Sequence, residues 1–194
     1  MALPRAYQAS FTPSEVEFIA SDEKIKIIPK TKLPRLQFIQ GTYGPFLPPL
    51  ATEVPIWLAL LMKKNNKCSI ICPDWLNIDF LKKRQEEEEK EQEFSNLPFH
   101  YMELSQMLLD AAPDDIPNAE QIHKILQDLQ ETREAKAREG FKALDDKWLG
   151  MNNLSFMEIN KIRPFFSLAF NEMRKLNLAD KNQSEEDLQN HTFH

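Results

Sequence analysis

The sequence predicts an α+β protein in which a small β-rich N-terminal domain precedes a mostly α-helical bundle domain and a disordered C-terminal tail. Eight of the 13 prolines lie in residues 1–55, where the apolar runs are short and β-branched. From Pro73 onward the apolar residues recur at helical spacing, and the last residues are rich in Asn, Gln, Ser and Glu. These changes place the two domains at residues 1–62 and 63–180 and the tail at residues 181–194.

The N-terminal domain opens with residues that favour the start of a helix. In Thr12-Pro13-Ser14-Glu15 the threonine can cap the helix, the proline suits the first helical position and the glutamate can complete a capping box. We expect this helix to end near Asp22. Strands are predicted at 25–29 and 36–39, because both segments are β-branched and alternate in polarity. Residues 41–46 are expected to form a turn.

The segment Glu53–Asn66 is predicted to be a buried helix. It begins with an acidic residue and a proline and ends near lysines, which suits the helix dipole, and it is apolar nearly all round. A strand is predicted at 68–72. These elements are marginal for an independent hydrophobic core, so we expect the domain to rely on another structure for support.

Four helical segments are predicted in the second domain, at 74–94, 98–112, 118–146 and from Ser155 onward. The third helix has an apolar face at each end but is polar at 132–134. Two apolar patches separated by a polar gap favour two packing partners, one of which could be the chain's own bundle and the other a different subunit. The alternative is a single long helix that packs only on its own neighbours.

The fourth helix starts with a capping box formed by Ser155 and Glu158. The helix needs apolar cover on more than one side. Its stripe recurs in steps of three and four residues, at Phe156, Ile159, Ile162, Phe166, Ala169, Met173 and Leu176.

The chain is acidic overall, but its charge is uneven. It contains 24 Lys and Arg against 30 Asp and Glu, and its pI is near 5.3. This disfavours tight DNA binding by the whole chain, because proteins that hold nucleic acid through its phosphates normally carry a basic surface. Residues 1–70 hold nine basic and five acidic residues, whereas residues 71–194 hold 15 and 25. The halves are expected to face different partners, and the acidic run at 86–93 to be the solvated end of a helix.

No catalytic, metal or cofactor site is predicted. The 4 glycines form no phosphate-binding motif, and the 4 histidines accompany no nucleophile elbow. Cys68 and Cys72 would lie about 13 Å apart in a strand, which is too far for a disulfide, and no further zinc ligands follow at suitable spacing. We expect free thiols in a reducing compartment and no enzymatic activity.

No membrane partner is expected. The longest uncharged apolar run of consequence, Ile56–Met62, has seven residues, whereas a membrane span needs about 20. The N-terminus has no apolar run behind its charge, unlike a secretory signal. We expect a soluble intracellular protein.

Several motifs occur along the chain in the order found in one protein family. They are residues 13–20 and 25–29, Gly44-Pro45-Phe46, 53–63, 67–70, Asp74-Trp75-Leu76, the Leu-Ser-x-x-Glu-Ile-Asn motif within 153–160, and Arg163-Pro164-Phe165. This order resembles the Partner of Sld Five Two family of eukaryotic GINS replication subunits, and the resemblance extends over residues 13–178. The acidic run at 86–93 and the tail after Asp180 lie outside it.

The resemblance implies the same domain order, a small β-rich domain followed by a helical domain. It implies a heterotetramer with three sibling GINS subunits, joined through the helical domains. In the nucleus that tetramer would join the MCM ring and a further cell-division-cycle protein to form the replicative helicase. ATP hydrolysis would belong to the ring, so this chain would be a non-catalytic scaffold that meets DNA at most indirectly.

The sequence is therefore consistent with two functions from different classes. As a scaffold subunit, the chain is expected to use the aromatic and aliphatic residues of its last two helices for subunit contact, at Phe141, Leu144, Trp148, Phe165, Phe166 and Phe170. The alternative is a single-stranded or forked DNA-binding factor that uses basic residues of the N-terminal half, at Lys24, Lys26, Lys30, Lys32 and Arg35.

Overall fold

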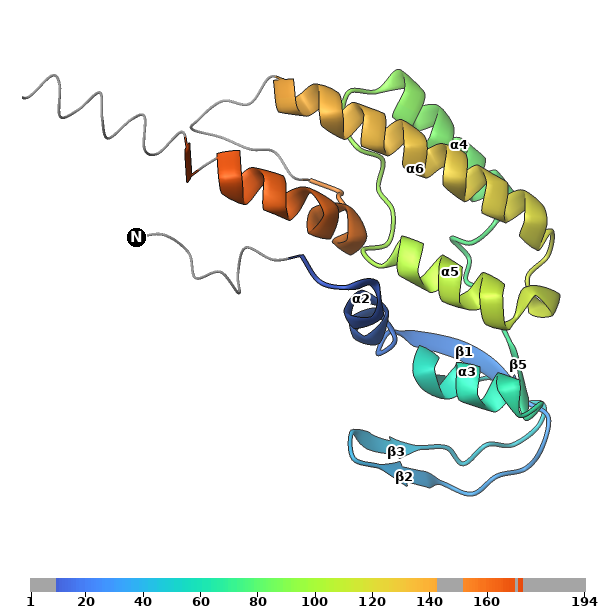
Figure 1. Ribbon diagram of the computed structural model, residues 1–194. Helices are drawn as coiled ribbons and strands as arrows, with labels where there is room; N and C mark the ends of the chain where they lie inside the picture. Colours follow the sequence, from blue (N-terminus) through green and yellow to red (C-terminus); the bar gives the residue numbers. More distant parts are fainter. Residues whose placement is uncertain (1–9, 143–151, 170, 173–194) are drawn as a thin grey trace, which may run out of the picture.

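The computed structural model describes residues 10–142, 152–169 and 171–172 (Figure 1). The elements run in the order α2 (Pro13–Ala20), β1 (Lys24–Pro29), β2 (Leu36–Phe38), β3 (Gly41–Tyr43), β4 (Thr52–Pro55), α3 (Ile56–Lys64), β5 (Cys68–Ile70), α4 (Ile78–Lys90), α5 (Tyr101–Ala111), η1 (Pro113–Asp115) and α6 (Ala119–Lys142). A further helix at 156–169 follows. The predicted α+β class is confirmed, and the predicted tail at 181–194 lies outside the described residues.

The N-terminal region contains a three-stranded antiparallel sheet in the order β4-β1-β5 and a separate hairpin of β2 and β3. Strand β1 alternates as predicted, with Ile25 and Ile27 inside and Lys24 and Lys26 outside. The register places Ile25 opposite Val54 and Ile27 opposite Ile70. The inner face of the sheet is thus built from β-branched side chains of all three strands.

Two predicted elements differ in this region. Residues 41–46, predicted as a turn, begin with strand β3, because Gly41–Tyr43 pair with Leu36–Phe38. The helix predicted from Glu53 begins three residues later, at Ile56, because Thr52–Pro55 form β4 instead. Backbone pairing with β1 outweighs the local preference for a helix start there.

The second region consists of helices. Helix α4 is shorter than the predicted 74–94, because Asn77 caps it by accepting a hydrogen bond from the N–H of Asp79 at 3.2 Å. Figure 1 shows α4 lying along α6, with α5 between α6 and the N-terminal sheet. The helix 156–169 lies beside α5 on the side where α2 is found.

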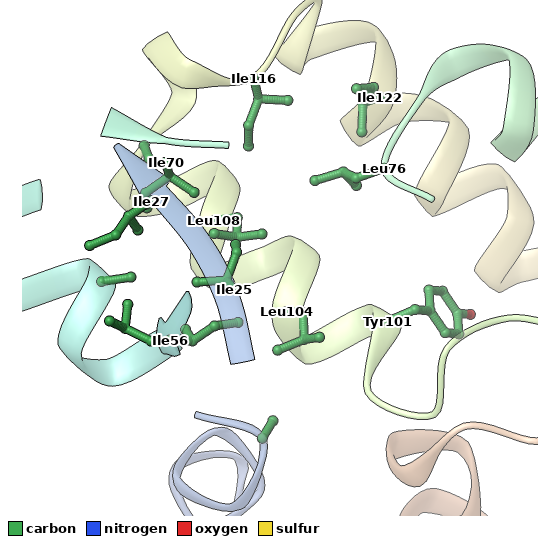
Figure 2. Packing of buried hydrophobic residues seen from close by; sticks show 14 of the residues in the cluster. Ile25, Ile27, Ile56, Ile70, Leu76, Tyr101, Leu104, Leu108, Ile116 and Ile122 are labelled. Carbon is green, nitrogen blue, oxygen red and sulfur yellow. The ribbon is translucent and has the colours of Figure 1, made fainter. Parts of the chain in front are cut away.

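One hydrophobic core joins the two regions. Figure 2 shows Ile25 and Ile27 of β1 beside Leu104 and Leu108 of α5, and Ile122 of α6 continues the same buried cluster. The expectation that the small N-terminal module needs outside support is confirmed by this shared core. The division predicted at residues 62 and 63 falls inside α3 and before β5, which completes the sheet.

Asp115 adds a polar tie between the two regions. Its carboxylate accepts a hydrogen bond from the backbone N–H of Ile70 at 2.7 Å and pairs with the ammonium of Lys63 at 2.8 Å. Because Asp115 belongs to η1 and its two partners belong to β5 and α3, this one side chain links the bundle to the edge of the sheet.

Candidate functional site

The part of the chain that the structure describes contains neither a metal-ligand cluster nor a membrane-spanning helix. No group of three or more His, Cys, Asp or Glu side chains there is placed to hold a metal ion. Nor does that part contain a helix long and apolar enough to cross a membrane. Cys68 and Cys72 are free, and burial raises the pKa of the Cys68 thiol to about 11, which makes it a poor nucleophile.

A buried charge cluster surrounds Arg133 and is here called the Arg133 cluster. Arg133 of α6 is only 1% exposed. Its Nε and Nη2 donate to the two carboxylate oxygens of Glu158 at 2.6 and 3.0 Å. Its Nη1 pairs with Glu88 of α4, which also pairs with Lys136. Two carboxylates and the guanidinium are thus held together away from water, with the partly exposed Lys136 at the edge.

Neutral groups complete the Arg133 cluster. Ser95 donates to Glu88 through both its N–H and its hydroxyl, each at 2.9 Å. The hydroxyl of Tyr101 donates to Glu158 at 3.3 Å, and the carbonyl of Asn153 accepts from Arg133 at 2.7 Å. The cluster therefore fixes α4, the loop after it, α5, α6 and the start of the last helix relative to one another.

The electrostatics of the Arg133 cluster follow from these contacts. Burial alone would raise the pKa of Glu88, but Lys136, Arg133 and Ser95 together hold it below its ordinary value. Burial likewise disfavours the charged form of Arg133, yet Glu158 and the other negative groups raise its pKa. Both groups are therefore charged at neutral pH.

The polar residues of the motif near residue 155 have structural roles. Ser155 and Glu158 form the predicted capping box, with the Ser155 N–H donating to Glu158 at 2.8 Å. The amide of Asn160 accepts from the N–H of Phe11 at 2.7 Å and donates to its carbonyl at 3.0 Å. This pairing, here called the Asn160 clasp, holds the segment before α2 against the last helix.

Aromatic rings surround the Asn160 clasp. The ring of Phe156 lies 5.8 Å from that of Phe11, 5.7 Å from that of Phe99 and 5.3 Å from that of His100. The backbone N–H of Phe156 also donates to the carbonyl of Phe99 at 2.8 Å. The start of the last helix is thus fixed to α5 and to the N-terminal segment together.

One sequence-based interpretation is wrong here. The acidic run at 86–93 is not wholly solvated, because Glu88 is 2% exposed and belongs to the Arg133 cluster. Two packing partners for α6 stay a prediction, but the polar gap at 132–134 is not exposed throughout, because Arg133 is buried within the chain. The spacing Ile122, Leu126, Leu129, Arg133 could have revealed this, because it places a charge in register with a core-facing stripe.

The predicted contact residues fall in different parts of the structure. On the last helix Phe165 is 48% exposed and Phe166 is 9% exposed, and their rings lie 6.0 Å apart. Phe141 belongs to α6, whereas Leu144, Trp148 and Phe170 lie outside the described residues. The sequence-based prediction omitted Leu168, which is 64% exposed one turn from Phe165.

The five basic residues of the alternative function are all exposed. Lys24 and Lys26 point outward from β1, whereas the others follow this strand along the chain. They line none of the described pockets. The described geometry therefore gives no specific support for nucleic-acid binding by these side chains.

Comparison with known proteins gives a consistent result. Residues 12–71 match a family model described as the PSF2 N-terminal domain, and residues 75–177 match one described as the GINS complex protein helical bundle domain. Over 176 residues the chain is 41% identical to the "DNA replication complex GINS protein psf2" of Schizosaccharomyces pombe, covering 91% of this chain and 96% of the relative. Over 167 residues it is 40% identical to the corresponding human protein, covering 84% and 90%.

Proposed function

From the fact that this chain belongs to the PSF2 family of GINS proteins, we propose that it is a subunit of a GINS complex in DNA replication. The observation that carries the proposal is the pair of family matches, which together span residues 12–177 in the order of the two structural regions. The fold supports a scaffold, because its buried polar groups hold helices together.

In this role the chain is a non-catalytic member of a heterotetramer with three sibling subunits. The tetramer braces the replicative helicase, formed with the MCM ring and its cell-division-cycle partner, in the nucleus. The described surfaces favour protein contact over chemistry: Phe165 and Leu168 are exposed on one helix, and large exposed apolar side chains commonly mark protein interfaces.

The subunit interface is proposed to comprise the aromatic and aliphatic residues of the last two helices. These are Phe141, Leu144, Trp148, Phe165, Phe166 and Phe170. The first domain is proposed to extend through β5, because that strand pairs with β1, and residues 181–194 are proposed to be a disordered tail.

The test is the native mass of the complex. The chain is co-expressed with the other three GINS subunits and measured by light scattering in 0.5 M salt. We expect one copy of each subunit in a single species, because packing of apolar helices resists salt. A well-behaved lone monomer that ignores the other three would contradict the proposal.

The interface assignment is tested in the same assay with Trp148→Ala and Phe166→Ala. Truncating a buried aromatic residue costs about 3–5 kcal/mol, so each variant should dissociate from the complex or unfold. Assembly like that of the unchanged chain in both variants would overturn this assignment.

The DNA-binding alternative rests on the five exposed basic residues at 24–35. Salt dependence separates it from the scaffold role. Five phosphate contacts predict a log–log slope of affinity against salt of about −3.5 to −4.5. A chain that binds forked DNA without such a slope does not use these five residues as phosphate contacts.

A further inference from the structure

Glu103 of α5 is a buried carboxyl group without a partner. The residue is 3% exposed, and neither carboxyl oxygen accepts a hydrogen bond. The nearest basic group is the Nδ1 atom of His100, 3.9 Å from Oε1, which is too long for a hydrogen bond. Buried carboxyl groups are ordinarily paired, so Glu103 requires an explanation.

No described neighbour supplies the missing positive charge. Burial lowers the pKa of His100, which keeps its ring neutral at neutral pH. Burial also raises the pKa of Glu103 to about 7, and nearby Glu158 adds to this. The backbone N–H groups of Glu103 itself and of Met157 oppose it only in part, without meeting hydrogen-bond geometry. In the chain by itself the carboxyl group is therefore divided between its neutral and charged forms near pH 7.

Glu103 forms part of the wall of a groove of about 300 Å³ between α5, α6 and the last helix. Glu17 of α2 also lines this groove and makes no ion pair among the described residues. The one lysine in the wall, Lys161, is engaged by Glu134 at 2.6 Å. The groove is consequently acidic and open to a cation from outside the chain.

We propose that this groove receives an arginine side chain from another subunit of the complex, which pairs with Glu103. This inference rests on the proposed function, since it assigns a chemistry to one contact of that assembly. An arginine fits better than a lysine, because the wall contains several acceptors, Glu103, Glu17 and glutamine amides, for its several N–H groups. Phosphate groups of DNA are disfavoured by the two carboxyl groups.

The environment favours such a pair energetically. A guanidinium is more weakly hydrated than an ammonium and is the usual cation of buried interface pairs. Because Glu103 itself is buried, the attraction of its carboxylate to a cation that reaches it is little screened by salt. Entry of the cation would also fix Glu103 in its charged form, so assembly would release a proton near pH 7.

The test uses the purified complex of the full chain with the other three GINS subunits. Its dissociation constant is measured by mass photometry on dilution, for the unchanged chain and for Glu103→Gln and Glu103→Leu. Loss of one member of a buried interface charge pair should weaken assembly at least about thirtyfold in both variants. Glu131→Gln, which removes an exposed charge from α6, is the matched control and should assemble normally.

A second readout separates a charge pair from a merely structural role. If Glu103 becomes charged on assembly, the unchanged complex should be roughly tenfold weaker at pH 6 than at pH 8 on account of this group. The Glu103→Gln complex should lack that component, while His100, Glu158 and Glu17 remain in both proteins.

The outcomes are distinguishable. If the unchanged chain fails to join the other subunits, the proposed function itself is contradicted. If it joins them and both Glu103 variants assemble with the same affinity and pH dependence, only the arginine pair is overturned, and Glu103 is a neutral core carboxyl group. Weakened assembly of Glu103→Leu with a lowered melting temperature of the chain itself would also overturn it, in favour of a folding role.

Discussion

Arg133 is the residue on which the helical region most depends. Its guanidinium contacts two carboxylates, a serine and a backbone carbonyl while fully buried. A buried ion pair adds little net stability compared with apolar packing, but removing one partner leaves an uncompensated charge in the interior. The Arg133 cluster therefore matters chiefly because removing one of its members would leave unpaired charges in the interior.

We expect Arg133→Met to destabilise the chain by about 3–5 kcal/mol, because Glu88 and Glu158 would both lose their shared cation. Urea unfolding followed by circular dichroism measures the change. The control is Arg138→Met on the same helix, whose ion pair with Glu134 involves a side chain that is 74% exposed; such pairs contribute about 1 kcal/mol or less. Equal effects in the two variants would contradict the structural role of Arg133.

The raised pKa of Glu103 predicts that the stability of the fold decreases as the pH rises, which is opposite to the effect of most carboxylates. Its pKa in the folded chain is about 7, against an ordinary value of 4.5. Between these values the folded chain keeps a proton that the unfolded chain has released, so stability falls as the pH rises through this window, by on the order of 3 kcal/mol. Glu103→Gln should remove this fall.

The measurement is urea unfolding of the full chain from pH 4.5 to pH 8, compared between the two proteins. His100 has a lowered pKa and acts in the opposite direction, but it is present in both and cancels in the difference. Parallel stability curves for the two proteins would show that Glu103 has an ordinary pKa.

At the scale of residues, local chemistry was predictable from sequence and long-range pairing was not. The capping boxes of Thr12 with Glu15 and of Ser155 with Glu158 depend on a spacing of three residues, which the sequence displays directly. The contact between Arg133 and Glu88 joins residues 45 positions apart. No local pattern selects Glu88 from its acidic neighbours, since only the fold brings it to α6.

At the scale of elements, the ends of helices and strands show where tertiary pairing prevails. Residues 53–55 have the composition of a helix start, yet they extend β4 because Ile25 and Val54 pair across the sheet. The long helices α5 and α6 agree with their predicted ranges over the described residues, because their apolar periodicity is sustained over several turns.

The last helix owes its position to the Asn160 clasp, which gives another prediction. Asn160→Ala should cost about 1–2 kcal/mol, because the N–H and carbonyl of Phe11 lose their partners at a partly buried site. Hydrogen exchange should show lost protection in the segment that precedes α2. Asn152→Ala, at an exposed position, is the control, and unchanged exchange at Phe11 in Asn160→Ala would contradict the clasp.

At the scale of the whole molecule, the described chain has one buried apolar cluster that includes the sheet, α3, α5 and α6. Figure 2 shows Leu108 of α5 where these elements meet. The two regions recognised by separate family models are therefore one unit in packing. The order of the regions was predictable from composition, but their shared core was not, since it depends on which faces meet.

A shared core predicts cooperative unfolding. Leu108→Ala should lower stability by about 2–5 kcal/mol, because it leaves a cavity at the junction. Hydrogen exchange should show β1 and α6 losing protection to the same extent, and calorimetry should show one transition. Leu50→Ala, 61% exposed, should change stability by less than about 0.5 kcal/mol. Two separate transitions, of which Leu108→Ala shifts only one, would contradict a single core.

The Asn160 clasp has a topological consequence. It joins positions 149 residues apart, so the path from Phe11 through both regions to Asn160 is nearly a closed ring. The two regions are therefore held together by the shared core and the clasp, and not by their order along the chain. A circularly permuted chain that began after β5 and re-entered α2 through a short linker from the last helix would retain the shared core, the Arg133 cluster and the clasp.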